Sequence, residues 1–232
     1  MGKIIFITGT DTGAGKTVLT ALLLGYLRGR GRAALAVKPF CSGDRADVAL
    51  LQQFQPGTLT EDEVNPWFFR QPVAPLVALR KAGKDVRLQA VLAHIHAVAK
   101  GCECLLVEGS GGLMVPLGEG YTVLDLINRL QCPVLLAAQN RLGCINHICL
   151  SLSVLKSVAG ADGAVVLMGT KIPDVSTRTN RQLIAEKSGK FPVFTLPYLG
   201  DANSDKEKVV KGTKRCCKTL SLLCAKSLDL RA

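Results

Sequence analysis

Short apolar runs alternate along the chain with longer segments in which apolar residues recur at helical spacing. Strands are expected at 3–8, 33–38, 102–108, 133–139, 163–168 and 191–195, and helices near 16–30, 46–55, 86–99, 122–130, 145–158 and 176–188. Runs without polar alternation are typical of strands that are buried on both faces. The order of elements therefore predicts a single α/β domain, a parallel sheet with helices on both faces. Such sheets bind ligands beyond the carboxyl ends of their strands, so the residues that follow each run are candidates for function.

Two segments depart from this rhythm. Residues 56–85 contain four prolines and no clear periodicity, which indicates a long surface connection. From Asp201 onward the chain is strongly charged with a few apolar residues, as in a terminal helix or tail. We therefore expect one domain over residues 1–200 and a basic C-terminal segment over residues 201–232.

The composition fits one soluble domain. A chain of 232 residues with 48% hydrophobic and 5% aromatic residues can bury one aliphatic core. No apolar run approaches the roughly 18 residues of a membrane span, and the first expected strand begins at Lys3 without a signal sequence before it. The nine cysteines form no paired CxxC motif, so we expect reduced thiols. These features favour a cytoplasmic protein without a membrane partner.

The formal net charge is +11, and residues 201–232 hold eight Lys and Arg against four Asp and Glu. A basic surface can attract nucleic acid or anionic lipid, but it equally suits an enzyme whose ligands are phosphates and carboxylates. The excess outside the C-terminal segment is diffuse, which favours a solvated surface and no nucleic-acid partner.

The first strand leads into a glycine-rich loop that opens a helix. Residues 9–17 read GTDTGAGKT, and an apolar helical segment follows from Val18. Small residues let the chain curl so that successive N–H groups surround phosphate oxygens, and the helix adds its positive dipole end. Lys16 is then expected to reach the outer phosphates, and Thr17 offers a hydroxyl to Mg²⁺. The loop is one residue longer than the general pattern, and it predicts a site for a nucleoside triphosphate.

The second strand ends at Lys38, within the sequence KPFCSG. Pro39 and Gly43 fix a tight loop there, so a lysine that leaves a buried strand at this edge is expected to act on a ligand. The alternative is a solvated strand end. Ser42 could donate a hydrogen bond to an anion, and Asp47 follows in the same segment.

The third strand ends in Glu108, and glycines follow at 109, 111 and 112. Glycines permit close approach of the backbone to a ligand, and the strand order brings Glu108 beside the phosphate loop. With Thr17 and Asp47, Glu108 supplies oxygen ligands of the kind that Mg²⁺ selects. A salt bridge from Glu108 to Lys16 or Lys38 is the alternative.

The fourth strand leads to a glycine turn at Gly143 that opens another helix. Free N–H groups at such a helix start can hold a carboxylate. His147 is interpreted as a helix-face residue, because no carboxylate or nucleophile lies near it in sequence. His94 and His96 lie two residues apart and cannot share a metal ion on one helix.

Four blocks of sequence together resemble the dethiobiotin synthetase family. They are GTDTGAGKT at 9–17, KPFCSG at 38–43, VEGSGGLMVPL at 107–117 and LGCINH at 142–147. Weaker agreement lies at 65–66, 71–75 and 196–199, so the resemblance spans about residues 3–200 and excludes the basic segment. It implies a synthetase domain of the P-loop NTPase-like fold over residues 1–200, in a subunit that works as a homodimer.

The family's reaction closes a urea ring. By this resemblance, an amine of 7,8-diaminopelargonate captures CO₂ as a carbamate, and the carbamate oxygen attacks the γ-phosphate of ATP or another nucleoside triphosphate. The second amine then displaces phosphate to give dethiobiotin. No covalent enzyme intermediate is needed, so the protein has to position the reactants and neutralise charge. Two lysines and a Mg²⁺ ion can neutralise the negative charge of the transferring phosphoryl group.

The resemblance also assigns roles to residues. Those implied to be catalytic are Lys16, Lys38 and Thr12, and those around the metal ion are Thr17, Asp47 and Glu108. Substrate binding is implied for Lys38, Ser42 and Asn146, with Asn146 holding the substrate carboxylate across the dimer interface. Nucleotide binding is implied for Gly13, Ala14, Gly15, Lys16, Thr17, Val18, Asp47, Glu108, Gly109, Ser110 and Gly111, and Pro197, Tyr198 and Leu199 would flank the base.

The identity of the base stays open. Where the family commonly places an asparagine against adenine, this chain reads LMGTKIPD at 167–174. Thr170, Lys171 and Asp174 there resemble the guanine-reading loop of GTPases, although the spacing between Lys171 and Asp174 is one residue longer than in that loop. Cys41 and Cys144 lie near the predicted site, which raises the question of oxidation sensitivity.

Two other classes share a phosphate loop of this kind. The synthetase domain of cobyrinic acid diamide synthesis comes with a glutaminase domain, for which this chain is too short and has no cysteine between glycines. Partitioning ATPases, which grip membrane or DNA, place a lysine five residues before the phosphate-loop lysine, where this chain has Asp11. Lys38 and Glu108 have no evident role in such a switch, so a synthetase is favoured.

Overall fold

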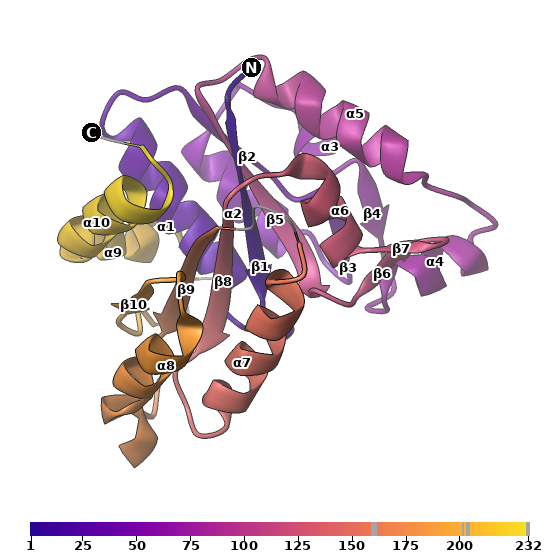
Figure 1. Cartoon of the computed structure of the whole chain (residues 1–232). Coiled ribbons are helices and arrows are strands. Elements are labelled where there is room, and N and C mark those ends of the chain that lie inside the picture. The colour runs from indigo at the N-terminus through magenta and orange to yellow at the C-terminus, as the bar shows by residue number, and fades with distance from the viewer. Residues whose placement is uncertain (159–161, 201, 203–204, 231–232) are drawn as a thin grey trace.

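Six parallel strands form the central sheet, in the order β10-β9-β8-β1-β5-β2 (Figure 1). The computed structural model describes residues 1–158, 162–200, 202 and 205–230. The strands are β1 (Lys3–Gly9), β2 (Ala34–Val37), β5 (Cys104–Gly112), β8 (Val134–Gln139), β9 (Gly163–Met168) and β10 (Val193–Leu196). Each overlaps an expected strand, although β5 continues past its expected end at Glu108 through the glycines to Gly112. All five pairings are parallel, so the predicted sheet is confirmed.

Side chains of each strand alternate between two cores, one on each face of the sheet. In β1, Ile5 and Ile7 join one core, and Ile4 and Phe6 join the other. The first core lies under α1 (Lys16–Arg28), α2 (Ala46–Phe54), α9 (Lys206–Arg215) and α10 (Cys217–Ser227). The second lies under α5 (Leu88–Ala99), α6 (Val123–Leu130), α7 (Cys144–Leu155) and α8 (Asn180–Ser188). The prediction of helices on both faces is therefore confirmed.

Segment 56–85, expected as a long surface connection without clear periodicity, contains three short elements that were not predicted. It forms α3 (Glu61–Val64), β4 (Trp67–Phe69) and α4 (Pro75–Lys81), and β4 pairs in parallel with β3 (Phe40–Ser42). Thr60 caps α3 in a reciprocal capping box with Glu63, and the Trp67 ring stacks on Phe40 with centroids 5.1 Å apart. These contacts hold the segment against the chain that follows β2.

Short elements also follow two of the central strands. A hairpin of β6 (Pro116–Gly118) and β7 (Tyr121–Thr122) comes after β5, and the 3₁₀ helix η1 (Val175–Arg178) comes after β9.

The C-terminal segment forms two helices, α9 and α10, which lie beside α1 (Figure 1). Val209, Leu220 and Leu223 are fully buried in the core that α1 covers. Residues 201, 203–204 and 231–232 of the expected segment lie outside the described residues, and the domain boundary at residue 200 stays a prediction. Within the described part of the chain, no helix has the length and apolar character needed to cross a membrane.

Candidate active site

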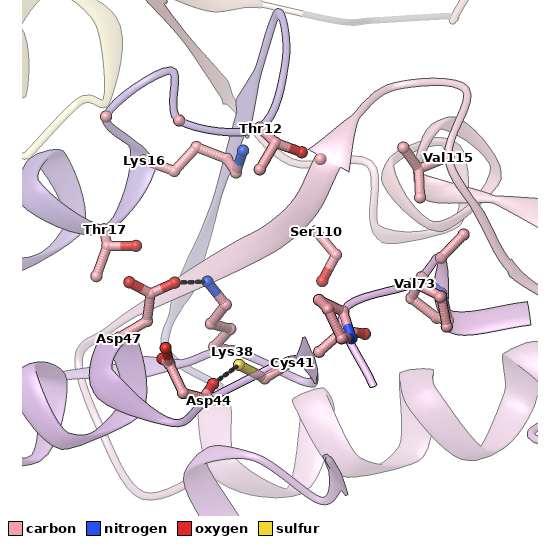
Figure 2. A pocket seen from close by; sticks show the side chains of 17 residues that line it. Thr12, Lys16, Thr17, Lys38, Cys41, Asp44, Asp47, Val73, Ser110 and Val115 are labelled. Carbon is pink, nitrogen blue, oxygen red and sulfur yellow. Dashed lines mark hydrogen bonds and ion pairs between the residues drawn. The ribbon is translucent and has the colours of Figure 1, made fainter. Parts of the chain in front are cut away.

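A cavity of about 550 Å³ opens beyond the carboxyl ends of β1, β2 and β5 (Figure 2). Its lining comes from segments far apart in the sequence, namely Thr12, Gly13, Gly15, Lys16 and Thr17, then Lys38, Cys41, Ser42, Asp44 and Asp47, then Pro72, Val73, Ala74 and Pro75, and finally Ser110, Gly111 and Val115. Figure 2 shows Lys16 and Lys38 reaching toward this space from opposite sides. The two lysines singled out from the sequence thus face one cavity.

The phosphate loop is held in a tight curl between β1 and α1. Gly15 caps α1 with φ of 93°, a left-handed conformation, and a Cβ there would lie 2.9 Å from the Met168 side chain. Gln139, at the end of β8, donates from Nε2 to the Gly13 carbonyl oxygen at 2.9 Å. Gln139 was not predicted as a site residue, although a polar residue that ends an apolar strand was a usable signal.

Lys16 is buried at the start of α1 and folds back over the loop. It is 7% exposed, and its Nζ donates to the carbonyl oxygen of Asp11 at 3.0 Å. Burial lowers the pKa of Lys16, and the Coulomb attraction of Glu108 opposes this shift. A ligand anion would offset the same cost of burial, which gives phosphate oxygens a favourable place beside this amine.

Lys38, just after β2, forms the centre of an ion-pair cluster with Asp47 in the first turn of α2 and Glu108 within β5. Its Nζ pairs with Asp47 and donates to Glu108 Oε1 at 2.7 Å, and the Thr17 hydroxyl donates to the same Glu108 oxygen at 2.7 Å. Burial disfavours the charge on Lys38, but the attraction of Glu108 and Asp47 outweighs it and raises the pKa of Lys38. Lys38 is therefore an ammonium throughout the physiological pH range. The salt bridge from Glu108 to Lys38, left open by the sequence, is present.

The residues around this cluster fit a Mg²⁺ ion. Among the described residues no group of three or more His, Cys, Asp or Glu is arranged to hold a metal ion, so any site depends on mixed ligands. Thr17, Asp47 and Glu108 offer a hydroxyl and two carboxylates, and Glu108 Oε2 is buried without a hydrogen-bond partner in the described structure. An unpartnered buried carboxylate oxygen is costly, and a hard cation would offset that cost.

Ser42 presents a second unpartnered polar group to the cavity. Its Oγ is buried and has no hydrogen-bond partner in the described structure. The neighbouring polar groups are engaged, because the Cys41 thiol donates to the Asp44 carbonyl oxygen at 3.0 Å and the Ser110 hydroxyl donates to the Phe40 carbonyl oxygen at 2.6 Å. Burial raises the pKa of the Cys41 thiol to about 11. Beside Cys41 and Ser110, the Ser42 hydroxyl is therefore free to donate a hydrogen bond to a ligand in the cavity.

Asn65 fixes the chain around Lys38. Its Nδ2 donates to the carbonyl oxygens of Lys38 and Pro39 at 2.8 and 3.1 Å, and the Lys38 N–H donates to the Val64 carbonyl oxygen. The residue is fully buried. This positioning role of Asn65 was not predicted from the sequence, in which Asn65 was only a point of family agreement.

Several expected site residues do not line the cavity. Val18 is buried in the core, and Gly109 packs on Phe6, where a Cβ would lie 2.9 Å from the ring. Asn146 is exposed on the first turn of α7. Residues 197–199 follow β10 and are not among the residues that line the cavity. Ala14 lines a small separate hollow. Pro72, Val73 and Val115 do line the cavity, although no role was predicted for them.

Asp174 has a structural role in the turn before η1. Its Oδ2 accepts from the Leu142 N–H at 2.8 Å, and its Oδ1 accepts from the N–H and hydroxyl of Ser176. These hydrogen bonds, that of the Ser176 hydroxyl first, lower the pKa of Asp174. Both carboxylate oxygens accept hydrogen bonds from the protein, so Asp174 helps to hold the turn together whether or not a base is bound. The same contacts join the chain after β9 to the start of α7.

Comparison with known proteins finds matches over nearly the whole chain. The family described as "AAA domain" matches residues 3–206. The chain is 36% identical over 215 residues to the ATP-dependent dethiobiotin synthetase BioD of Bacillus subtilis strain 168, covering 90% of this chain and 92% of the relative. It is 38% identical over 196 residues to the protein of the same name from Akkermansia muciniphila, covering 84% and 89%.

Solved structures with the same fold come from more distant proteins. The ParA family ATPase of Chlorobium tepidum TLS superposes with a TM-score of 0.53 at 14% identity, covering 97% of this chain and 96% of that one. The MinC:MinD cell division complex of Aquifex aeolicus gives a TM-score of 0.55 at 12% identity, covering 94% and 96%. At such low identity these likenesses show the fold alone.

Proposed function

The chain belongs to the family of ATP-dependent dethiobiotin synthetases, and from this premise we propose that its cavity joins CO₂ to 7,8-diaminopelargonate and closes the ring of dethiobiotin. It is an ATP-dependent ligase of biotin synthesis. One observation carries the proposal: the phosphate loop, with Lys16, and the end of β2, with Lys38, face the same cavity. A nucleotide γ-phosphate and a small acceptor can therefore meet there between two positive charges.

The phosphate loop would hold the triphosphate. N–H groups of residues 13–15 and the start of α1 offer donors and a positive dipole end to phosphate oxygens. Lys16 would exchange the Asp11 carbonyl oxygen for the outer phosphates. Thr17, Asp47 and Glu108 would hold Mg²⁺, which neutralises phosphate charge when bound.

Lys38 would act at the acceptor. Its ammonium offsets the negative charge of a carbamate and of the phosphoryl group in transfer, and it is positioned by Asn65 and its ion pairs. Thr12 and the unpartnered Ser42 hydroxyl would bind the substrate end. The carbamate oxygen is thereby held in line with the γ-phosphate, which gives it the effective-molarity advantage of a bound nucleophile. The second amine then displaces phosphate as the ring closes.

We propose further that the working unit is a homodimer in which Asn146 of one protomer holds the substrate carboxylate of the other. Leu142, Ile172 and Val175 support an interface near the start of α7, because they are 74%, 84% and 85% exposed and lie on the two segments that Asp174 joins. Cytoplasmic location is proposed as well, supported by nine cysteines that are free thiols. Nucleic acid and membrane are not proposed as partners.

Phosphate release from ATP tests the reaction. The enzyme is assayed with Mg²⁺ alone, with diaminopelargonate, with bicarbonate, and with both together. Release should be slow alone and rise steeply only with both, because the carbamate brings a nucleophilic oxygen that neither addition supplies singly. Dethiobiotin should form in step with phosphate.

Parallel assays with DNA and with anionic lipid vesicles address the rival class. A partitioning-type switch would respond to one of these surfaces and be indifferent to the diamine. Stimulation by DNA or lipid without any by diamine plus bicarbonate would overturn the synthetase proposal.

A further inference from the structure

A second cavity, of about 490 Å³, lies between the last turns of α1 and α2 and the side of α9. We call it the α1/α9 groove. Helix α1 begins at the phosphate loop and ends here, about 20 Å away at 1.5 Å per residue. Figure 1 shows α9 and α10 beside α1, on the side of the molecule away from α4 and β6. The groove is therefore separate from the active-site cavity.

The floor of the groove is apolar. Phe54 and the Tyr26 ring line it together with Val210, which is 37% exposed. Gly25 lets the Phe54 ring and Thr213 of α9 pack closely on α1, because a Cβ there would lie 3.1 Å from the ring and 3.5 Å from the Thr213 hydroxyl. A concave apolar surface of this size is within the range of small-molecule sites, roughly 300–1,000 Å³.

The rim of the groove is positively charged. It carries Arg28, Arg30, Lys206 and Lys214, and none of the described residues that line it is an Asp or Glu. The Arg30 guanidinium lies 5.1 Å from the centre of the Tyr26 ring, and the Lys206 amine lies 5.8 Å from that of Phe54. Lys206 and Lys214 are two turns apart on α9, about 12 Å along its axis. Cations thus flank both ends of an apolar floor.

We propose that the α1/α9 groove binds an amphipathic carboxylate, with the carboxylate at Lys206 at the start of α9 and an aliphatic chain along Phe54 and Val210. The chain removes apolar surface from water, and the head group meets positive charge that no carboxylate of the lining offsets. The head group lies at the start of α9 because the last turns of α1, α2 and α9 present carbonyl groups, which repel an anion.

Octanoate is the probe, measured by isothermal titration calorimetry on the full-length protein. Octylammonium, which has the same chain and the opposite charge, should bind at least tenfold more weakly. Lys206→Glu with Lys214→Gln should weaken octanoate at least tenfold. The matched control is Lys211→Glu with Lys218→Gln, which makes the same charge change at exposed positions outside the groove and should leave octanoate affinity within twofold.

A second variant tests the apolar floor. Val210→Trp fills the groove from the exposed side of α9 and should abolish octanoate binding, with thermal unfolding used to confirm the native fold. Equal affinity for octanoate and octylammonium, unchanged binding in the double lysine variant, or binding retained by Val210→Trp would each overturn the proposal. If octanoate does not bind and Val210→Trp shifts the sedimentation coefficient, the groove is instead a contact between copies of the chain.

Discussion

Lys38 carries its positive charge between two carboxylates at the edge of the cavity. Lys38 and Glu108 are 7% and 1% exposed, so each is the main compensation for the burial of the other. This cluster brings together Thr17 from the first turn of α1, Lys38 from just after β2 and Glu108 from within β5. Lys38 and Glu108 were identifiable from the sequence because each follows an apolar run, and Thr17 because it follows the lysine of the phosphate loop. Their pairing was not, since it depends on the strand order.

Replacing Lys38 by Met should separate catalysis from nucleotide binding. Turnover should fall by about 10²- to 10³-fold, the usual effect of losing one preorganised charge donor. Nucleotide affinity, measured by equilibrium titration, should stay within about threefold, because Lys16 and the loop hold the phosphates. Normal turnover in this variant would remove Lys38 from its proposed role.

The same variant has a stability consequence that provides a control. Lys38→Met leaves Glu108 buried without its cation, which should cost about 3 kcal/mol of unfolding free energy in the absence of ligands. Adding Glu108→Gln should restore part of that free energy and none of the turnover. Denaturant unfolding of both variants measures the difference.

Cys41 should be a slow nucleophile although it lines the cavity. With its pKa raised to about 11, roughly one part in a thousand is thiolate at pH 8. Burial also raises the pKa of Cys144. Iodoacetamide at pH 8 should therefore modify the half-buried Cys149 and Cys217 first, as mass spectrometry can follow, and labelling of Cys41 should rise about 100-fold by pH 10. Rapid loss of activity through Cys41 at pH 8 would contradict this.

At the scale of elements, long periodic segments were predictable and short ones were not. The six strands and the helices over 16–188 follow from periodicity. In contrast, α3, β4 and α4 have four, three and seven residues, too few to show a period, and β4 pairs with a strand distant in sequence. The capping box from Thr60 to Glu63 was the available signal. The cavity wall at 72–75 was missed for the same reason.

The ends of β9 and β10 lack the side chain that commonly selects adenine. Gly169 occupies this position after β9, and a Cβ there would lie 2.4 Å from the backbone nitrogen of Tyr198, which follows β10. Asp174 accepts a hydrogen bond from the Leu142 N–H at the start of α7. We expect the affinities for ATP, GTP and CTP to lie within about tenfold, or 1.4 kcal/mol, of each other. Competition against a fluorescent nucleotide measures them. A preference of several hundredfold for ATP would mean that another group reads the base.

Helix α9 contacts the loop proposed to flank that base. Gly212 faces Leu199, where a Cβ would lie 2.5 Å from Leu199 Cδ1. Gly212→Val should displace Leu199 and weaken nucleotide binding about three- to tenfold, with a loss of about 1–3 kcal/mol in stability from overpacking. The exposed neighbour Lys211→Val is the control. An unchanged nucleotide affinity in a folded Gly212→Val protein would place the base away from Leu199.

For the whole molecule, the exposed apolar residues beside α7 mark where two copies are expected to meet. Ile172 and Val175 are 84% and 85% exposed, while the facing turn is held by the Asp174 contact to Leu142. Replacing both exposed residues by Asp should convert a dimer to a monomer in sedimentation velocity, because burying two charges per copy disfavours association. Turnover should fall together with the dimer fraction.

Subunit complementation then tests whether the active site is shared. The proposal places Asn146 of one protomer and Lys38 of the other in the same active site. A mixed dimer of one Lys38→Met chain and one Asn146→Ala chain then has one site with both residues intact and one site with neither. Equal mixing and exchange make half of the dimers mixed, so about a quarter of the wild-type sites should work again. Each variant alone has none intact. A mixture no more active than the sum of its parts would place Asn146 and Lys38 in the same protomer's site and refute the shared arrangement.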